Sequence, residues 1–322
     1  MRFYQSNEFG LLALIVLFGT IFTFVTPGFS SNFNLFSLSR TMSIDIMIGF
    51  SMMVVIVTGG LNLAVGAIGV CTAMACGFFL ERLGLPLFIA IPAALLFGAA
   101  LGAINGTLIV KSGLHSFIIT LATMSIFFGA MIYLTHAEAY RQLTPEFSQF
   151  GKLRVAGTIS ALLILSMCIG LLLAALYRFT PLGRRMLAAG ANAAAAELSG
   201  IRVGKTYIAC HALSGSLAGL AAMMVMARNG AAIPSMAGHL GQDWLLPAFL
   251  GPVLGGTLLM GGRVSVLGTF LGSALVTTLT NGLLQLKIGE FWIQATLGVI
   301  LLIAVLIDLA RRTYFQNRKA AP

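Results

Sequence analysis

Between two long apolar runs of this chain lies a segment rich in basic residues, Tyr177–Tyr207. It carries five Arg or Lys side chains and a single acid, Glu197. A charged side chain at the centre of a bilayer costs about 3 kcal/mol, so five of them would cost on the order of 15 kcal/mol. The segment is therefore a loop between two membrane spans. Its excess of basic residues predicts a cytoplasmic location, and we place the loop at 178–206.

Inside this loop the residue pattern predicts a helix of about two turns. Asn192 is a favourable N-cap, and the alanines at 193–196 have the highest helix propensity. Gly200 is suited to the position that follows the last turn. So short a helix is marginal alone in water, because nucleation costs more than two turns return. Held at both ends by spans, it has the form of a segment that inserts into a partner's groove, although an ordinary helical loop has the same pattern.

Composition identifies a polytopic membrane protein. Apolar residues make up 58% of the 322 residues and charged residues only 9%, whereas a soluble domain carries about 25% charged residues. The net charge of +10 does not indicate nucleic-acid binding, because of where the charges lie. The predicted cytoplasmic segments hold 12 of the 19 basic residues but only three of the nine acids, so the charge follows membrane topology.

Ten apolar segments are candidates for membrane spans, each of which needs about 20 residues, or fewer where a helix is broken. They are residues 10–27, 44–58, 64–80, 86–104, 117–135, 157–177, 207–228, 245–261, 265–285 and 291–309. Ten spans place both termini in the cytoplasm, and nine spans with a re-entrant segment at Gly59–Gly66 is the alternative. We predict an all-α transmembrane bundle of about ten spans, in a single domain that covers residues 1–322.

Small residues recur at every fourth position in three of the spans. They are Gly98, Gly102 and Gly106, then Gly215 and Gly219, then Gly268 and Gly272. This spacing lets helix backbones approach closely in lipid, so it predicts a tightly packed bundle. Two patterns also occur twice: GGxxLxxG at 59–66 and 255–262, and NGxLxxKxG at 105–113 and 281–289. Such duplications are typical of transporters built from internal repeats.

The sequence has no pattern of a membrane-embedded enzyme. Its four histidines are scattered, its four cysteines lack metal or disulfide spacing, and no HExxH, GxSxG or paired carboxylates occur. Asp45 and Asp308 are expected near span ends, which leaves no acid for an ion relay inside the bundle. We therefore expect no metal, no cofactor and no catalytic residue.

Nucleotide binding by this chain is also excluded by the residue pattern. Residues 199–206 read SGIRVGKT, which falls short of a phosphate-binding P-loop because Ser199 stands where the first glycine belongs. A transporter with neither an ion relay nor a P-loop must take its energy from a separate subunit. This conclusion directs attention back to the basic loop.

Five motifs along the chain resemble those of ribose-type permeases of sugar ABC importers. They are TGGLNLAVGAIG (58–69), NGTLIVKSGLHSFIITLATM (105–124), TPLGRRMLAAGANAAAAELSGIRV (180–203), GGTLLMGGRVSVLGTFLG (255–272) and NGLLQL (281–286), followed by Ile307-Asp308. Together they cover nearly the whole chain in order. The resemblance implies a permease subunit of the bacterial inner membrane, without enzymatic activity of its own. Its implied partners are a cytoplasmic ABC ATPase that holds ATP, a periplasmic sugar-binding protein, and a second permease copy, identical or paralogous.

The resemblance also assigns the 180–203 segment to engagement of the ATPase. The residues assigned to this coupling role are Pro181, Gly183, Arg184, Gly190, Asn192, Ala195, Glu197, Leu198 and Gly200. Asn62, Asn105 and Asn281 are candidates for hydrogen bonds to substrate along the path, and each fits equally a role in satisfying backbone groups of a broken helix. The chain departs from the family pattern at Asn62, where related permeases usually carry Asp, and at Leu245 and Pro247, where they often carry acids.

The scarcity of intramembrane charge favours a neutral solute, and we predict import of a neutral monosaccharide. An amino acid would call for a charge pair, or for helix ends directed at its carboxylate. The alternatives are a branched-chain amino-acid permease of the same superfamily, an ion-coupled secondary transporter and an intramembrane enzyme.

Overall fold

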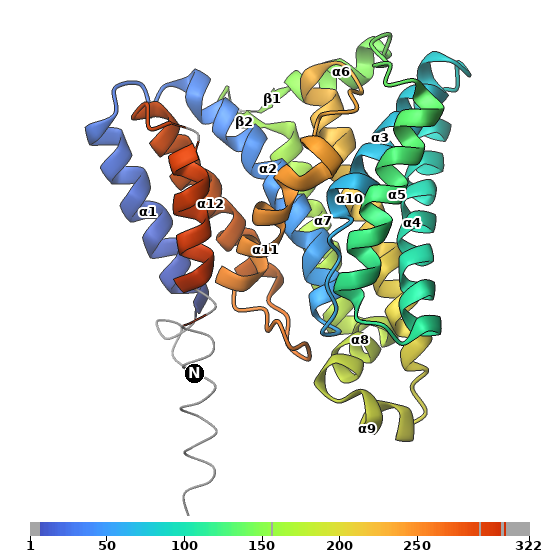
Figure 1. The fold of residues 1–322 in the computed structure, drawn as a ribbon. Coiled ribbons are helices and arrows are strands. Elements are labelled where there is room, and N and C mark those ends of the chain that lie inside the picture. Colours follow the sequence, from blue (N-terminus) through green and yellow to red (C-terminus); the bar gives the residue numbers. More distant parts are fainter. Residues whose placement is uncertain (1–6, 156, 290, 304–305, 307–322) are drawn as a thin grey trace, which may run out of the picture.

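The computed structural model describes residues 7–155, 157–289, 291–303 and 306. Its long helices run side by side between two ends of the molecule (Figure 1). The α6 end carries α6 (Pro145–Lys152) and the hairpin of β1 (Arg154–Val155) and β2 (Ile159–Ser160). The opposite end, the α8 end, carries α8 (Pro181–Ala191) and α9 (Ala193–Leu198). The all-α prediction is confirmed.

Seven described helices are long and apolar enough to cross a membrane. They are α1 (Asn7–Val25), α2 (Asn32–Ile56), α4 (Leu87–Ser112), α5 (Ser116–Thr135), α7 (Ala161–Phe179), α10 (Val203–Asn229) and α12 (Val266–Gln285). The other three predicted spans hold shorter helices: α3 (Val65–Glu81), α11 (Leu245–Leu254) and Phe291–Ile303. Each predicted span thus contains a helix, which agrees with a bundle of about ten spans.

The second span begins twelve residues earlier than its predicted start at 44. Ser31 caps α2 by accepting the N–H of Asn34, and the polar residues that follow are buried against protein rather than lipid. Asp45 therefore lies well inside a membrane-spanning helix and not near its end, which corrects the expectation. Its carboxylate accepts a 2.7 Å hydrogen bond from Thr277 of α12. Asp308, and the predicted end of the last span, lie outside the described residues.

Two of the crossings begin as irregular chain and only then become helical. Residues 57–64 lead into α3, and residues 230–244, including the irregular 3₁₀ turn η2 (His239–Trp244), lead into α11. Glycines and a proline explain the irregularity, because they disfavour a continuous helix: Gly59 and Gly60 in the first segment, and Gly230, Pro234, Gly238 and Gly241 in the second. The segment at 59–66 is thus the first part of the third crossing.

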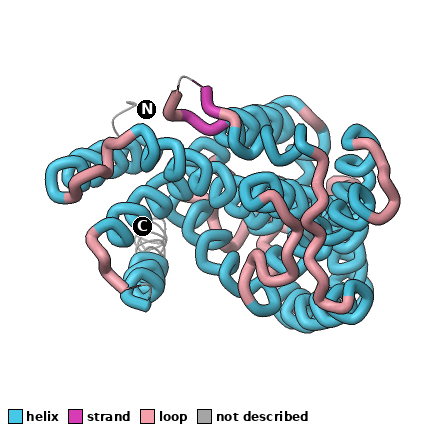
Figure 2. The backbone as a smooth tube through the Cα atoms, turned by 90° about the horizontal axis from the view of Figure 1, so that it is seen from above, coloured by secondary structure: helices cyan, strands magenta, loops and turns pink. Residues whose placement is uncertain are grey.

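Helix α10 lies at the centre of the bundle, against α2, α3 and α4. The glycine stripe of α4 faces it: Gly102 packs directly on the backbone of His211, and a Cβ on Gly98 would lie 2.8 Å from the carbonyl oxygen of Gly215. The stripe thus serves close helix packing, as predicted. Seen from the α6 end, the helices stand mostly end-on and the loops cross between them (Figure 2).

Candidate functional site

The loop between α7 and α10 folds into two helices at the α8 end. Thr180 caps α8 by accepting the N–H of Gly183 at 3.1 Å, and Pro181 occupies the first helical turn, where no N–H is needed. Asn192 ends α8 and caps α9, since its side-chain oxygen accepts the N–H of Ala195 at 3.0 Å. Gly200 follows with a φ of +80°. The predicted short helix is confirmed as α9.

Helix α8 was not predicted, and it contains Gly183 and Gly190 of the predicted coupling residues. The Thr180-Pro181 pair is a recognised signal for the start of a helix and would have revealed it. The basic loop, predicted at 178–206, is also shorter than predicted. It spans 180–202, because α7 continues through Arg178 to Phe179 and α10 begins at Val203.

Helix α9 is attached along one side only. Ala196 is buried together with Ala189 of α8 and Val203 of α10. The other side is open: Leu198 is 92% exposed, and Ala195 and Glu197 are exposed beside it. Complete burial of a leucine is worth about 1.5–3 kcal/mol, so burial of Leu198 by another protein would be favourable.

The remaining predicted coupling residues divide into exposed and packed positions. Pro181, Arg184, Asn192 and Gly200 are exposed. Gly183 is buried against the backbone of Leu176 and Tyr177 in α7, where a larger residue would overlap the chain. Gly190 faces inward, toward the irregular segments.

Gly190 belongs to a junction of three backbone segments. A Cβ at this position would overlap the carbonyl oxygen of Val57 and lie 2.6 Å from the nitrogen of Gly262. The N–H of Gly262 donates to the same Val57 carbonyl at 2.9 Å. A Cβ on Gly261, whose φ is +87°, would lie 2.7 Å from the nitrogen of Gly59. We call these five residues the glycine junction; in it α8, the end of α2 and the loop after α11 touch without intervening side chains.

The repeated GGxxLxxG pattern marks two of these segments. Its copies at 59–66 and 255–262 are both irregular, and they meet at the glycine junction. Glycine is required there because the backbones approach more closely than any Cβ allows.

Side chains of neighbouring helices satisfy the backbone of the irregular segment 57–64. The N–H of Leu61 donates to the hydroxyl of Ser116 at 2.9 Å, and the N–H of Leu63 donates to the hydroxyl of Thr120 at 3.1 Å. From α10, the hydroxyl of Tyr207 donates to the carbonyl of Thr58 at 2.8 Å. Non-helical backbone at membrane depth needs such partners, so α5 and α10 fix the course of this segment.

The three predicted path asparagines do not share one surface. Asn62 is fully buried and donates to the hydroxyl of Ser214 at 2.9 Å. Asn105 is fully buried in α4, and its side-chain atoms have no partner among the described residues. Asn281 of α12 exchanges hydrogen bonds of 3.1 and 3.2 Å with Asn34, near the start of α2. Whether any of them contacts solute stays a prediction.

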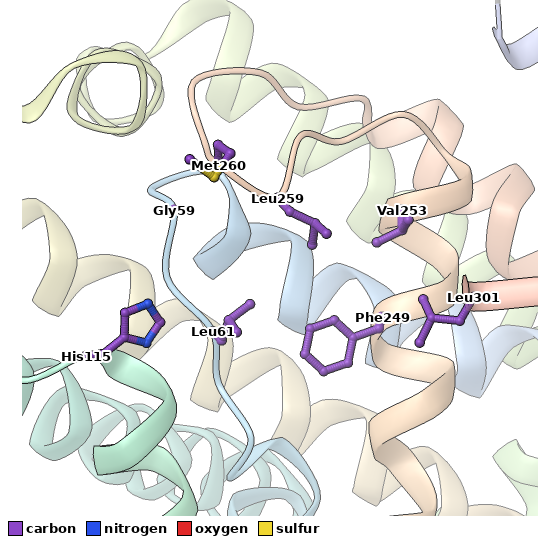
Figure 3. Close-up of a pocket in the computed structure, with 8 residues that line it drawn as sticks. All are labelled: Gly59, Leu61, His115, Phe249, Val253, Leu259, Met260 and Leu301. Carbon is purple, nitrogen blue, oxygen red and sulfur yellow. The ribbon is translucent and has the colours of Figure 1, made fainter. Parts of the chain in front are cut away.

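A pocket of about 340 Å³ lies beside the glycine junction (Figure 3). In the close-up, His115 and Phe249 lie on opposite sides of it with Leu61 between them. The described residues that line it come from five separate segments: Gly59, Leu61, His115, Phe249, Val253, Leu259, Met260 and Leu301. Sequence reasoning missed this pocket, because its residues carry no common motif and lie far apart in the chain.

His115 has a defined role in its helix as well as in the pocket. Its Nδ1 accepts the N–H of Phe117 at 3.2 Å and so caps α5. In a neutral imidazole whose Nδ1 accepts, the proton is on Nε2, so the other ring nitrogen is a hydrogen-bond donor. The part of the chain that the structure describes holds no group of three His, Cys, Asp or Glu side chains placed to bind a metal ion.

Comparison with known proteins gives a consistent result. A family profile described as "Branched-chain amino acid transport system / permease component" matches residues 34–307. The ribose import permease protein of Bacillus subtilis is 35% identical over 302 residues, 93% of this chain and 90% of that protein. The Escherichia coli ribose import permease protein is 33% identical over 308 residues, 92% of each chain. The chain belongs to the ribose-type ABC importer permease family.

The D-allose transport system permease protein of E. coli is a further relative, 30% identical over 303 residues, which are 94% of this permease and 91% of that one. No solved structure matches. As a member of this family the permease is a multi-pass protein of the inner membrane and a transport subunit rather than an enzyme. Membership also implies an ATPase and a periplasmic binding protein as partners.

Proposed function

We propose that this permease forms the membrane path of an ATP-driven importer for a neutral monosaccharide. Relatives that match more than nine-tenths of its length are named as permeases for ribose, D-allose or autoinducer 2, and the ribose permeases are the most similar of these in identity, which supports a sugar over the branched-chain amino acid of the family description. An ion-coupled mechanism has less support. Asp45 is an acid inside the bundle, but it already accepts a hydrogen bond from Thr277.

In this proposal α9 docks on the ATPase, which binds and hydrolyses the ATP. The observation that carries it is the state of α9: a capped helix, fixed on one side, with Leu198 92% exposed at its tip. Insertion of this anchor into a partner's groove buries the leucine. Gly190 of the glycine junction lies in the last turn of α8, directly before α9 begins, so a displacement of α9 would reach α2 and the loop after α11 through direct backbone contact.

The orientation follows from the same assignment. The α8 end and both termini face the cytoplasm, which agrees with the excess of basic residues there. The α6 end then faces the periplasm and the sugar-binding protein. A second permease copy, identical or paralogous, completes the importer, and Asn62, Asn105 and Asn281 remain proposed contacts or supports of the path.

The test is reconstitution of the permease with the ATPase and binding protein encoded beside it, using D-ribose and D-allose as probes. Leu198→Asp places a charge where the proposed groove is apolar, and Leu198→Met keeps the anchor. We expect Leu198→Asp to reduce co-purification with the ATPase and sugar-stimulated hydrolysis by about tenfold or more, the equivalent of about 1.4 kcal/mol. Leu198→Met should remain close to the unmodified protein. If Leu198→Asp leaves both measurements intact, α9 is not the docking element.

A further inference from the structure

We infer that the pocket beside the glycine junction is the water-filled exit of the solute path, and that Phe249 and His115 contact the solute directly. The identity of the solute as a neutral sugar rests on the proposed function. The inference that the pocket contains water does not rest on the proposed function, because it follows from backbone carbonyls in the segment that lines the pocket.

Gly59 and Leu61, both from the irregular segment 57–64, line one side of the pocket. Among the hydrogen bonds of the described residues, none ends on the carbonyls of Gly59, Gly60 or Leu61. Irregular backbone within a membrane is stable only where protein covers it or water reaches it, since hydrocarbon offers no hydrogen-bond partner to a carbonyl. These carbonyls therefore need water as a partner, and the pocket that Gly59 and Leu61 line is the cavity from which water can reach them.

The lining suits a neutral polyhydroxylated ring. Phe249 offers an aromatic face for the C–H side of a sugar. The Nε2–H of His115 can donate to a hydroxyl, and the main-chain carbonyls can accept from others. The described residues that line the pocket are otherwise apolar and include no Asp, Glu, Lys or Arg, so an ionised solute finds no permanently charged side chain of opposite sign there.

The position of the pocket connects it to α8 and, through α8, to α9. Gly59 belongs both to the pocket lining and to the glycine junction, and Met260 of the lining directly precedes Gly261. A shift of α8 against Val57 and Gly262 thus moves two walls of the pocket at once. Closure of the ATPase would change the width of this exit without contact between the ATPase and the solute.

Thiol reactivity tests the aqueous path without any knowledge of the solute. Cys168, the exposed native cysteine, is first replaced by Ser. Leu61→Cys and Phe249→Cys then report on the pocket, Leu198→Cys on open solvent, and Leu96→Cys, 70% exposed on α4, on the lipid face. The permease in lipid nanodiscs is treated with a charged, water-soluble methanethiosulfonate. Because only the thiolate reacts, and it forms in water but not in lipid, we expect positions 61 and 249 to react at least about tenfold faster than position 96.

Equal rates at positions 61, 249 and 96 would overturn the assignment. Thermal unfolding of each variant confirms that it is folded. Because positions 61 and 249 lie on different segments, a local folding defect caused by one substitution cannot explain fast reaction at both.

Sugar contact is tested separately in the reconstituted importer. We expect Phe249→Ala to reduce uptake of D-ribose or D-allose by about fivefold or more, with Phe249→Tyr near the unmodified level. His115→Asn keeps a side chain that caps α5, but its donor group does not extend as far into the pocket. His115→Ala removes both the cap and the donor. A reduction in sugar uptake that both variants share therefore reports the lost contact with the solute. Normal uptake by Phe249→Ala and His115→Asn would disprove the contact. If the unmodified importer carries neither sugar, the proposed solute class fails, while the thiol measurements still decide the path.

Discussion

The N–H of Gly262 donates to the carbonyl oxygen of Val57 at 2.9 Å, and Gly190 packs against that same oxygen. This contact joins three segments that are distant in sequence: the end of α2, the end of α8 and the loop after α11. Backbone contacts of this kind have no side-chain rotamers with which to absorb a movement. A displacement of α8 would therefore reach the two irregular segments through the carbonyl of Val57.

Gly190→Ala tests this junction. In the last turn of α8 the substitution should favour the helix by at most about 0.5–1 kcal/mol, the value for the middle of a helix. Its Cβ overlaps the Val57 carbonyl, however, and overpacking of this kind costs about 1–3 kcal/mol, so the net effect should be destabilising. Gly129→Ala in α5 is the matched control, because a Cβ there meets nothing within 4 Å. We expect the melting temperature of the purified permease to fall for the first variant and to stay or rise for the second; the same shift for both would contradict the packing argument.

A pair of proline substitutions tests whether α9 must be helical. Ala193→Pro falls at the first helical position, which proline favours, and the preceding Asn192 is already extended with φ −161° and ψ 103°. Glu197→Pro falls in the last turn and costs about 3 kcal/mol, enough to unfold six residues. Both variants should insert into the membrane normally. Only Glu197→Pro should lose co-purification with the ATPase, and equal binding by the two would show that the helix is not needed.

The hydroxyl of Thr120 is expected to stabilise the irregular segment 57–64. Thr120→Val leaves the N–H of Leu63 without its partner, which costs about 1–3 kcal/mol for a buried group. Thr107→Val is the control, because that hydroxyl bonds only to Ala103 of its own helix and its loss should cost within about 0.5 kcal/mol. Thermal unfolding in detergent measures both. A cost for Thr107→Val as large as that for Thr120→Val would show that Thr120 does not act through Leu63.

Topology is tested by labelling at the two ends of the molecule. Ala193 on α9 and Gln149 on α6 are both exposed and lie at opposite ends (Figure 1). In whole cells that lack Cys168, a membrane-impermeant maleimide should label Gln149→Cys and leave Ala193→Cys unlabelled until the inner membrane is opened. Labelling of both positions in intact cells would contradict the proposed orientation.

Much of the membrane fold was predictable, because a bilayer imposes length and polarity on each span. Ten apolar segments, the basic loop and the capped α9 all follow from local patterns of residues near one another in the chain. The boundaries of α2 were not predictable in the same way. Its first turns carry Asn34, Ser39 and Ser43, which read as a loop until other helices bury them.

The sequence by itself determined the class of this protein and the place of its basic loop, since hydropathy, charge and helix capping act over a few residues. Only the tertiary structure revealed the glycine junction and the pocket beside it. Val57, Gly190 and Gly262 meet through backbone contacts between distant segments, and His115 and Phe249 face each other across the pocket from helices more than a hundred residues apart. No local pattern encodes such contacts, because they depend on how whole helices pack around the glycines that let them approach.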